Sequence, residues 1–221
     1  MKIAVIGRGG HSKVICDMIL SDEKNEIVGF LDDKYEQVSL IENAFCGPIK
    51  SAKRMIEYIK DIKFVIAIGD NKVRELIAQR LKIPDEYYVT LIHNSAEISP
   101  SARIGKGTVV MPYTVINADT EIGLHSIINT GSVIEHDCKA GNYVHVCPSA
   151  TLTGAVHLEN GAFIGAGATI IPNIKIGEWS IIGAGATVIN HIPSFCMAVG
   201  VPAKIFKVNE GGGEYIAQYN V

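Results

Sequence analysis

The sequence predicts a two-domain protein, in which a small α/β domain is followed by an all-β parallel β-helix. Three observations lead to this prediction. First, a short apolar run near the start is followed by a glycine-rich turn and then by an amphipathic helix. Second, apolar runs alternate with segments whose apolar residues have helical spacing, up to about residue 92. Third, a strict six-residue repeat extends from Ala96 to His191. A period of six fits neither a helix nor a simple alternating strand, and it is typical of hexapeptide β-helices.

The repeat places a branched or small aliphatic residue at every sixth position. These positions are Ile98, Ile104, Val110, Ile116, Ile122, Ile128, Ile134, Ala140, Val146, Leu152, Leu158, Ile164, Ile170, Ile176, Ile182 and Val188. If three hexads form one triangular coil, each of these side chains points inward and stacks on its equivalent in the next coil, about 4.8 Å away. Gly or Asn often follows and suits a corner, because both residues tolerate positive φ. The repeat therefore predicts a prism about 25 Å tall.

The region before the repeat reads as alternating strands and helices. The expected strands cover residues 2–6, 26–31, 63–68 and 87–92, and the expected helices cover 12–20, 49–60 and 72–81. This order is typical of a small parallel sheet with crossover helices, a half-size Rossmann-like domain. We expect domains at residues 1–93 and 94–207, and a C-terminal tail at 208–221 in which Tyr215 and Tyr219 could dock on a neighbouring subunit.

Composition excludes several classes of partner. The formal net charge of −3 argues against nucleic acid or an anionic membrane as the partner. No apolar run approaches the length of a transmembrane helix, and the start of the chain lacks a signal-peptide layout, so we expect a cytoplasmic protein. The five cysteines are scattered without a CxxC pair, which indicates reduced, buried thiols.

Three loops of the α/β domain are candidates for binding a nucleotide. Residues 7–12 form a glycine-rich turn that opens a helix, where unpaired backbone N–H groups can bind a pyrophosphate. The dinucleotide fingerprint is only partly met, because its third glycine would fall on Ser12, and a tight turn without a ligand is the alternative. Asp32 and residues 69–71 end the next expected strands, so all three loops converge on one crevice. Asp32 could equally belong to a solvated turn.

His136 is the leading candidate for a catalytic group in the repeat. It lies between Glu135 and Asp137, away from the inward positions, so it should face the outer surface or a corner. Asp137 could hold the imidazole in one tautomer and raise its basicity, as a general base near neutral pH requires. The alternative is an ordinary surface histidine beside an acid.

The other histidines of the repeat offer weaker signals. His145 precedes an inward position and should also point outward, whereas His125, His157 and His191 are expected at surface or corner positions. A zinc site would need three ligands within about 2.1 Å of one point. Such a set could form only across a subunit interface, and we therefore predict no metal.

Cys147 raises an alternative mechanism. It follows an inward position near His145, so a thiolate nucleophile that forms an acyl-enzyme is conceivable. The other interpretation is a small side chain packed at a corner.

Taken together, these residues resemble the bacterial nucleotide-sugar N-acetyltransferases. The resemblance rests on the Gly-x-Gly-Gly-His-Ser turn at residues 7–12, the hexads, the segment from Ile128 to Asp137 and the closing segment from Val199 to Lys204. Members of this family act on UDP-linked bacillosamine precursors or GDP-perosamine, and sialic acid O-acetyltransferase-like proteins belong to the same group. The segment 65–71 is most similar to the perosamine-type members.

The resemblance implies a left-handed β-helix, a homotrimer with active sites in the grooves between prisms, and acetyl-coenzyme A as the acetyl donor. It implies that His136 is the catalytic histidine and Asp137 its acidic partner. The nucleotide-linked amino sugar would bind to Gly9, Gly10, His11, Asp32, Asn71 and, on the acceptor side, Asn129. Acetyl-coenzyme A would contact His145, Gly154, Ala166, Ala184 and the segment from Pro202 to Lys204. Some relatives have glycine where this chain has Ala184.

The predicted function is direct transfer of an acetyl group to a sugar amine, with His136 as general base and a backbone N–H near Gly154 stabilising the oxyanion. Two other functions stay open at this point. One is O-acetylation of a sugar hydroxyl, which the same histidine would serve. The other is a non-catalytic protein that binds a nucleotide sugar.

Overall fold

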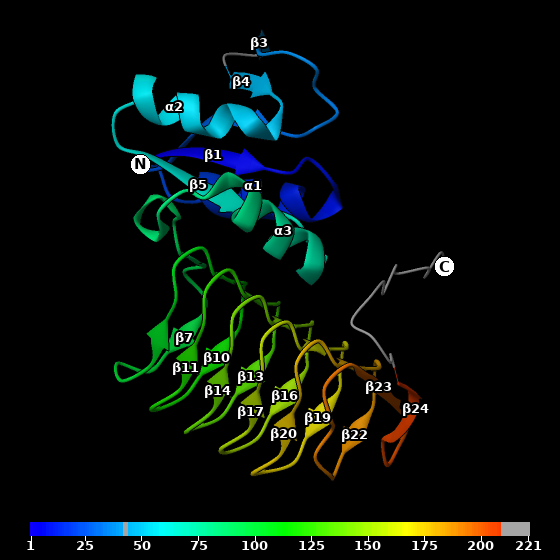
Figure 1. Cartoon of the computed structure of the whole chain (residues 1–221). Coiled ribbons are helices and arrows are strands. Elements are labelled where there is room, and N and C mark those ends of the chain that lie inside the picture. The colour runs from blue at the N-terminus through cyan, green and yellow to red at the C-terminus, as the bar shows by residue number, and fades with distance from the viewer. Residues whose placement is uncertain (42–43, 209–221) are drawn as a thin grey trace.

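A computed structural model describes residues 1–41 and 44–208 of the chain. The α/β domain lies on one side of a prism formed by the repeat, and helix α3 is the helix nearest to the prism (Figure 1). The predicted fold class is confirmed. Tyr215 and Tyr219, and with them the docking predicted for the C-terminal tail, lie outside the described residues.

The α/β domain contains one five-stranded sheet in the order β3-β4-β2-β1-β5. Its strands are β1 (Lys2–Ile6), β2 (Glu26–Leu31), β3 (Ser39–Ile41), β4 (Ala44–Gly47) and β5 (Ile62–Ile66), and its helices are α1 (Gly10–Leu20), η1 (Ile49–Ser51), α2 (Ala52–Tyr58), α3 (Asn71–Leu81) and η2 (Asp85–Tyr87). Strands β2, β1 and β5 pair in parallel, as predicted. The sequence reading missed β3 and β4, which form an antiparallel pair at the edge of the sheet.

The predicted strand at residues 87–92 is wrong. Residues 85–87 form the short helix η2, and β6 (Leu91–Ile92) belongs to the β-helix, where it pairs with β9 (Val109–Val110). Only an isolated bridge joins Tyr88 to Phe64 of the α/β sheet. The prediction fails because the chain already follows the first coils of the prism at this point, as the hydrogen bond from Leu91 N–H to the carbonyl of Thr108 shows.

The β-helix is built from short parallel strands on three sheets. Besides β6 and β9, the strands are β7 (Glu97–Ile98), β8 (Arg103–Ile104), β10 (Val115–Ile116), β11 (Glu121–Ile122), β12 (Ile127–Ile128), β13 (Val133–Ile134), β14 (Lys139–Ala140), β15 (His145–Val146), β16 (Thr151–Leu152), β17 (His157–Leu158), β18 (Phe163–Ile164), β19 (Thr169–Ile170), β20 (Lys175–Ile176), β21 (Ile181–Ile182), β22 (Thr187–Val188), β23 (Cys196–Val199) and β24 (Lys204–Val208). The six-stranded sheet runs β22-β19-β16-β13-β10-β7, the five-stranded sheet runs β20-β17-β14-β11-β8, and the eight-stranded sheet runs β24-β23-β21-β18-β15-β12-β9-β6.

The aliphatic ladder fills the prism as the repeat predicts. Strand β13 pairs with β10 and β16 so that Ile134 stacks between Ile116 and Leu152, three inward positions in register. Together with the other inward residues from Val110 onward, these side chains form one hydrophobic core. Ile98 and Ile104 in the first coil are only partly buried. Strands β23 and β24 pair antiparallel at the other end of the prism.

Three edges join the three sheets, and each edge carries residues spaced eighteen apart. The docking edge, between the five- and eight-stranded sheets, contains Gly107, His125, Tyr143, Gly161 and Trp179. The alanine edge, between the eight- and six-stranded sheets, contains Thr130, Pro148, Ala166 and Ala184, and it ends at the turn between β23 and β24, which includes Pro202. The histidine edge, between the six- and five-stranded sheets, contains Ala118, His136, Gly154 and Pro172.

The α/β domain packs on the docking edge and on the adjoining outer face of the eight-stranded sheet. Ile3, Val5 and Ile15 of the domain share a buried cluster with Val109 and Met111, which point outward from β9 and the residue after it. Apolar burial of this kind is the main source of favourable free energy between packed elements.

No helix in the described part of the chain combines the length and the apolar character that crossing a membrane requires.

Candidate active site

His136 and Asp137 form an exposed pair on the histidine edge. The imidazole Nδ1 lies 2.8 Å from Asp137 Oδ2, and both side chains are 62% exposed. The turn that holds them places Asp137 at φ 60°, a conformation that a short polar residue tolerates. The hydrogen bond to Asp137 raises the pKa of His136. Because Nδ1–H donates to the carboxylate, the neutral ring carries its free lone pair on Nε2, as a general base requires.

Gly154 lies one coil further along the same edge, directly beside the imidazole. A Cβ atom added to Gly154 would lie 2.7 Å from His136 Cε1 and 2.8 Å from Nε2, which is closer than real side chains approach. The absence of a side chain at this position therefore leaves the space that the ring occupies. The sequence places Gly154 in the coenzyme groove, and the structure adds that it adjoins the predicted base.

His145 has a different environment from the one predicted. Its side chain points away from the prism interior, but only 8% of the residue is exposed because the α/β domain covers it. Nδ1 lies 3.3 Å from the Gly69 carbonyl, Nε2 lies 3.1 Å from Asn129 Nδ2, and the ring contacts Phe163 edge-on. Burial, followed by the charge of Arg74, lowers the pKa of His145 to about 3. The predicted outward direction is therefore correct, but the α/β domain encloses the side chain.

These contacts also bear on the predicted role of His145. Both ring nitrogens are hydrogen-bonded, one to the nucleotide-binding domain and one to the predicted acceptor-side residue Asn129. A neutral imidazole has one donor and one acceptor, so neither is left for the thioester in this arrangement. His145 thus contacts the predicted acceptor-side residue, and its role in coenzyme binding stays a prediction.

His125 is also buried, and it occupies a corner, one of the two positions that the sequence predicts for it. It lies at a corner with φ 51°, and the rings of Tyr88 and Tyr143 pack against it. Burial lowers its pKa to about 4, with a smaller contribution from the charge of Arg74. The docked α/β domain is again the reason, because it supplies Tyr88.

The glycine-rich turn keeps the geometry expected of an anion site. Helix α1 begins at Gly10, and a Cβ atom added to Gly9 or Gly10 would meet nothing within 4 Å. His11 in the first turn is largely buried, and its Nε2 has no hydrogen-bond partner among the described residues. Burial, and then the charge of Arg74, lowers the pKa of His11 to about 4. The helix N-terminus and a nearby buried guanidinium together favour an anion.

Asp32 organises the loop that follows β2. Its Oδ2 accepts a hydrogen bond of 2.8 Å from Arg8 N–H, and its Oδ1 accepts one of 3.0 Å from Lys34 N–H. The carboxylate thereby joins this loop to the glycine-rich turn. It lies at the carboxyl end of the sheet, where the sequence places the nucleotide, and its further role in binding stays a prediction.

Asn71 does not have the free amide that the nucleotide-binding prediction requires. Its Nδ2 donates to the carbonyls of Gly161 and Ala162 at 3.1 and 3.4 Å, and its Oδ1 accepts a hydrogen bond of 2.8 Å from Arg74 Nη2. The side chain is buried between the domains. Asn71 therefore joins the α/β domain to the β-helix, and its role in nucleotide binding stays a prediction.

The predicted coenzyme residues Ala166 and Ala184 are aligned along the alanine edge, and Pro202 lies in the turn at its end. Ala166 and Ala184 are exposed, and the Ala166 carbonyl accepts a hydrogen bond of 2.8 Å from Gly185 N–H. Lys204 begins β24, the last strand of the neighbouring eight-stranded sheet. Small side chains along this edge leave space for an extended ligand.

The predicted base and most of the predicted coenzyme residues therefore lie on two different edges of the prism. Asn129 begins the corner that leads onto the alanine edge, whereas His136 and Gly154 lie on the histidine edge. The six-stranded sheet separates these two edges within one chain. Within a single chain, the predicted base His136 is therefore separated from both the acceptor-side Asn129 and the alanine edge.

The thiol of Cys147 is poorly suited to the acyl-enzyme alternative. Burial raises the pKa of the Cys147 thiol to about 12, so the thiolate needed for an acyl-enzyme is scarce near neutral pH. All five cysteines are free thiols. Within residues 1–41 and 44–208, no group of three or more His, Cys, Asp or Glu side chains is placed to hold a metal ion.

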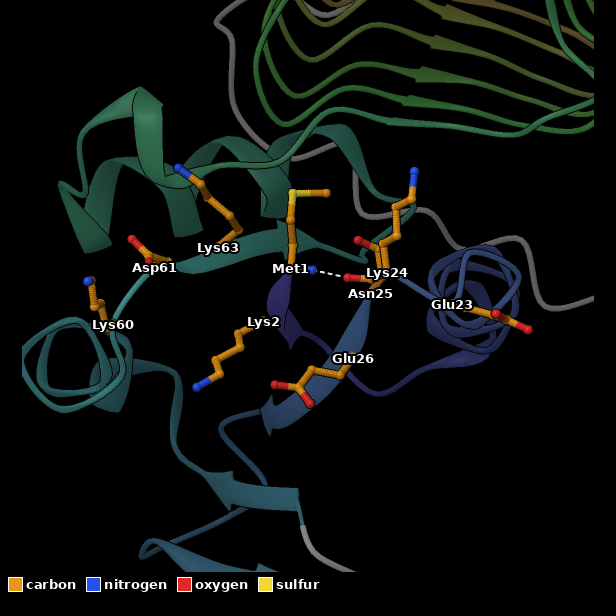
Figure 2. A pocket seen from close by; sticks show the side chains of 9 residues that line it. All are labelled: Met1, Lys2, Glu23, Lys24, Asn25, Glu26, Lys60, Asp61 and Lys63. Atoms are coloured by element: carbon orange, nitrogen blue, oxygen red, sulfur yellow. Dashed lines mark hydrogen bonds between the residues drawn. The ribbon is translucent and has the colours of Figure 1, made fainter.

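An open cavity of about 510 Å³ lies at the opposite end of the α/β sheet, where β1, β2 and β5 begin (Figure 2). It is lined by Met1, Lys2, Glu23, Lys24, Asn25, Glu26, Lys60, Asp61 and Lys63. Ligands of open parallel sheets bind at the carboxyl ends of the strands, so this cavity is not the nucleotide site.

Comparisons with known proteins agree with the geometry. Residues 2–81 match the PglD N-terminal domain, and residues 155–190 match the bacterial transferase hexapeptide of six repeats. The UDP-N-acetylbacillosamine N-acetyltransferase of Bacillus subtilis (strain 168) is 46% identical over 109 residues, which are 49% of this chain and 50% of that protein. The GDP-perosamine N-acetyltransferase of Escherichia coli O157:H7 is 33% identical over 99 residues, 45% of each chain. The alignments thus span about half the length of these curated relatives.

Solved structures match over nearly the whole chain. PerB from Caulobacter crescentus, in complex with CoA and GDP-perosamine, has a TM-score of 0.83 and 35% identity, covering 93% of this chain and 97% of that chain. The acetyltransferase domain of PglB from Neisseria gonorrhoeae has a TM-score of 0.78 and 31% identity, covering 92% and 98%. The chain belongs to the family of nucleotide-sugar N-acetyltransferases with a hexapeptide-repeat, left-handed β-helix.

Proposed function

We propose that the protein transfers the acetyl group of acetyl-coenzyme A to the amine of a nucleotide-linked amino sugar. The observation that carries the proposal is the exposed His136–Asp137 pair, with its hydrogen bond of 2.8 Å, in a chain of this family. The solved relative PerB was captured with CoA and GDP-perosamine, which supports the same two substrate classes here.

In the proposed reaction His136 acts as general base. Nε2 accepts a proton from the sugar amine while the amine nitrogen attacks the thioester carbonyl, and Asp137 stabilises the resulting imidazolium through Nδ1–H. A backbone N–H near Gly154 stabilises the oxyanion of the tetrahedral intermediate. The C–S bond then breaks, and the coenzyme thiolate takes the proton from the imidazolium.

The α/β domain supplies binding energy away from the reacting amine. In this proposal Gly9, Gly10 and His11 bind the pyrophosphate, and Asp32 binds the ribose or the base. The open backbone at the glycines and the buried guanidinium near His11 support this role. Binding the nucleotide part positions the amine for attack.

We further infer that the active site forms between subunits of a homotrimer. Asn129 and the alanine edge, which includes Ala166 and Ala184, lie on one side of the six-stranded sheet, and His136 lies on the other side. If the alanine edge of one protomer faces the histidine edge of the next, acetyl-coenzyme A and the base meet in one groove. A closed cyclic trimer repeats this contact three times.

Thiol release from acetyl-coenzyme A tests the proposed function. The full-length protein is assayed with UDP-, GDP- and dTDP-linked amino sugars, and in parallel with the matching sugars that carry a hydroxyl in place of the amine. Turnover with at least one amino sugar, and none with its hydroxyl counterpart, is the expected result. Turnover with hydroxyl acceptors alone would show an O-acetyltransferase. Nucleotide-sugar binding without any thiol release would show a non-catalytic protein.

A further inference from the structure

Arg74 is the largest polar side chain in the buried part of the molecule. It lies in α3, only 1% exposed, at the contact between the α/β domain and the docking edge. Burial lowers its pKa to about 9, so the guanidinium stays charged near neutral pH. A charge buried this deeply needs hydrogen bonds to offset its lost hydration.

Carbonyl oxygens from both domains provide those hydrogen bonds. On the β-helix, Nε donates to the carbonyl of His125 at 2.7 Å, and Nη2 donates to that of Tyr143 at 3.0 Å. On the α/β domain, Nη1 donates to the carbonyls of Ile68 and Gly69 at 3.0 and 3.2 Å. The planar guanidinium therefore fixes the loop after β5 relative to two successive coils of the prism.

The carbonyl of Gly69 extends this network into the predicted active site. The same oxygen lies 3.3 Å from His145 Nδ1, and Nε2 of that ring lies 3.1 Å from Asn129 Nδ2. Because a carbonyl can only accept, Nδ1 carries the proton and Nε2 accepts from the Asn129 amide. Asn129 Oδ1 in turn accepts a hydrogen bond of 2.8 Å from Thr130 N–H, which fixes the orientation of the amide.

We propose that Arg74 is a positioning residue of the acetyl transfer, which acts through the Gly69 carbonyl and the His145 ring to hold the Asn129 amide toward the acceptor sugar. One N–H of that amide donates to His145, and the other is left for the substrate. The proposal rests on the proposed function, because the acceptor-side role of Asn129 belongs to it. Arg74 itself touches neither substrate.

Arg74→Lys is the first test, because lysine keeps the charge but lacks the planar fork that reaches carbonyls of both domains. We expect kcat for the amino sugar to fall about tenfold or more, since small displacements of a positioned group are costly. The KM for acetyl-coenzyme A should stay within about twofold, because the coenzyme residues lie on another edge. Arg54→Lys, on the exposed face of α2, is the matched control and should leave both constants unchanged.

Two readouts separate positioning from simple loosening of the domains. The only tryptophan, Trp179, has Lys72 Nζ 3.1 Å from its ring centroid at the same domain contact, so its fluorescence reports whether α3 stays docked. A double-mutant cycle then combines Arg74→Lys with His145→Gln. If Arg74 acts through His145, the double variant loses no more kcat than His145→Gln alone. If the losses of kcat in the two single variants multiplied in the double variant, the proposal would be overturned.

A second variant covers the case in which Arg74→Lys disturbs docking. His145→Asn keeps a donor near the position of Nδ1 but loses the acceptor that Asn129 needs, so we expect a loss of kcat with normal Trp179 fluorescence. Full activity of His145→Asn would overturn the proposal.

The tautomer of His145 gives a readout that does not depend on turnover. Long-range ¹H–¹⁵N spectra of the wild-type protein should show Nδ1–H and an unprotonated Nε2 at His145, and Arg74→Lys should disturb this pattern. A wild-type protein with this tautomer but no acetyl transfer would contradict the proposed function and leave the network intact. An Nε2–H tautomer in an active enzyme would contradict the network alone.

Discussion

The histidine edge and the domain contact place the same type of residue in opposite environments. His136 and His145 both point outward from the prism, but His136 is exposed beside Asp137, whereas His145 is enclosed by the Gly69 loop and Phe163. The pKa of His136 is raised by a carboxylate, and the pKa of His145 is lowered to about 3 by burial. One ring is therefore suited to exchange protons, and the other to stay neutral and hold a fixed hydrogen bond.

This difference shows that the repeat determines the direction of a side chain but not its exposure. The six-residue period decides which residues fill the prism, and the docked α/β domain decides which outward residues become buried. A histidine that looks catalytic from its spacing can serve as a structural link.

Removal of the predicted base should have the largest effect. His136→Ala should lower kcat by about 10² to 10⁴-fold, because the amine loses its proton acceptor. Binding of nucleotide sugar and coenzyme A should stay close to wild type, as measured by calorimetry. His157→Ala, an exposed histidine of the neighbouring sheet, is the control. Near-normal turnover by His136→Ala on an acceptor that the wild type acetylates would show that another group is the base.

Displacing the same ring without removing it should have a smaller effect. A methyl group at Gly154 would overlap the imidazole, so Gly154→Ala should turn the ring away and lower kcat about tenfold. The melting temperature should hardly change, because the ring is exposed and free to move. Unchanged kinetics for this variant would mean that the observed ring position is not the catalytic one.

Asp137→Asn should shift the pH profile. The active form of His136 is neutral, so activity falls as the pH drops through the pKa of His136. Loss of the carboxylate lowers that raised pKa, and the acidic limb of kcat/KM should move to lower pH. The plateau should fall severalfold, because the weaker base accepts protons less readily. If the acidic limb of the Asp137→Asn profile stayed at the wild-type pH, Asp137 would not be the group that raises the pKa of His136.

The buried histidines should make the domain contact sensitive to acid. Their pKa values of about 4 for His11, about 4 for His125 and about 3 for His145 lie below the ordinary histidine pKa of about 6.5, so the unfolded chain binds protons that the folded chain does not. Stability should therefore fall as the pH drops below about 6.5 and continue to fall toward the folded pKa values, by on the order of 1 kcal/mol per pH unit for each residue. Melting temperatures between pH 7 and 5 check this, and a flat curve would contradict it.

The sequence predicts the parts of the site that depend on local patterns. The inward ladder follows from the period alone, and the hydrogen bond between His136 and Asp137 joins neighbours in sequence. The glycine-rich turn at α1 is likewise a local feature.

The burial of His125, His145 and Asn71 could not be read from such patterns, because it depends on how one domain docks on the other. A signal for Arg74 was nevertheless present in the sequence. It falls on the buried stripe of α3 with Ile77 and Leu81, at helical spacing. A charged residue on an apolar stripe indicates a buried polar contact, and here that contact is between the domains.

In the proposed homotrimer, each active site combines two edges from different protomers. His136→Ala and Ala184→Trp each disable one edge, and homotrimers of either variant should be nearly inactive. When the two variants are mixed, dissociated and reassembled in equal amounts, about a quarter of the sites combine two intact edges, so activity should recover to about a quarter of the wild-type value. Mass spectrometry confirms that mixed trimers have formed. Mixed trimers that stay as inactive as the two parents would contradict the claim, because they would show that each site lies within a single chain.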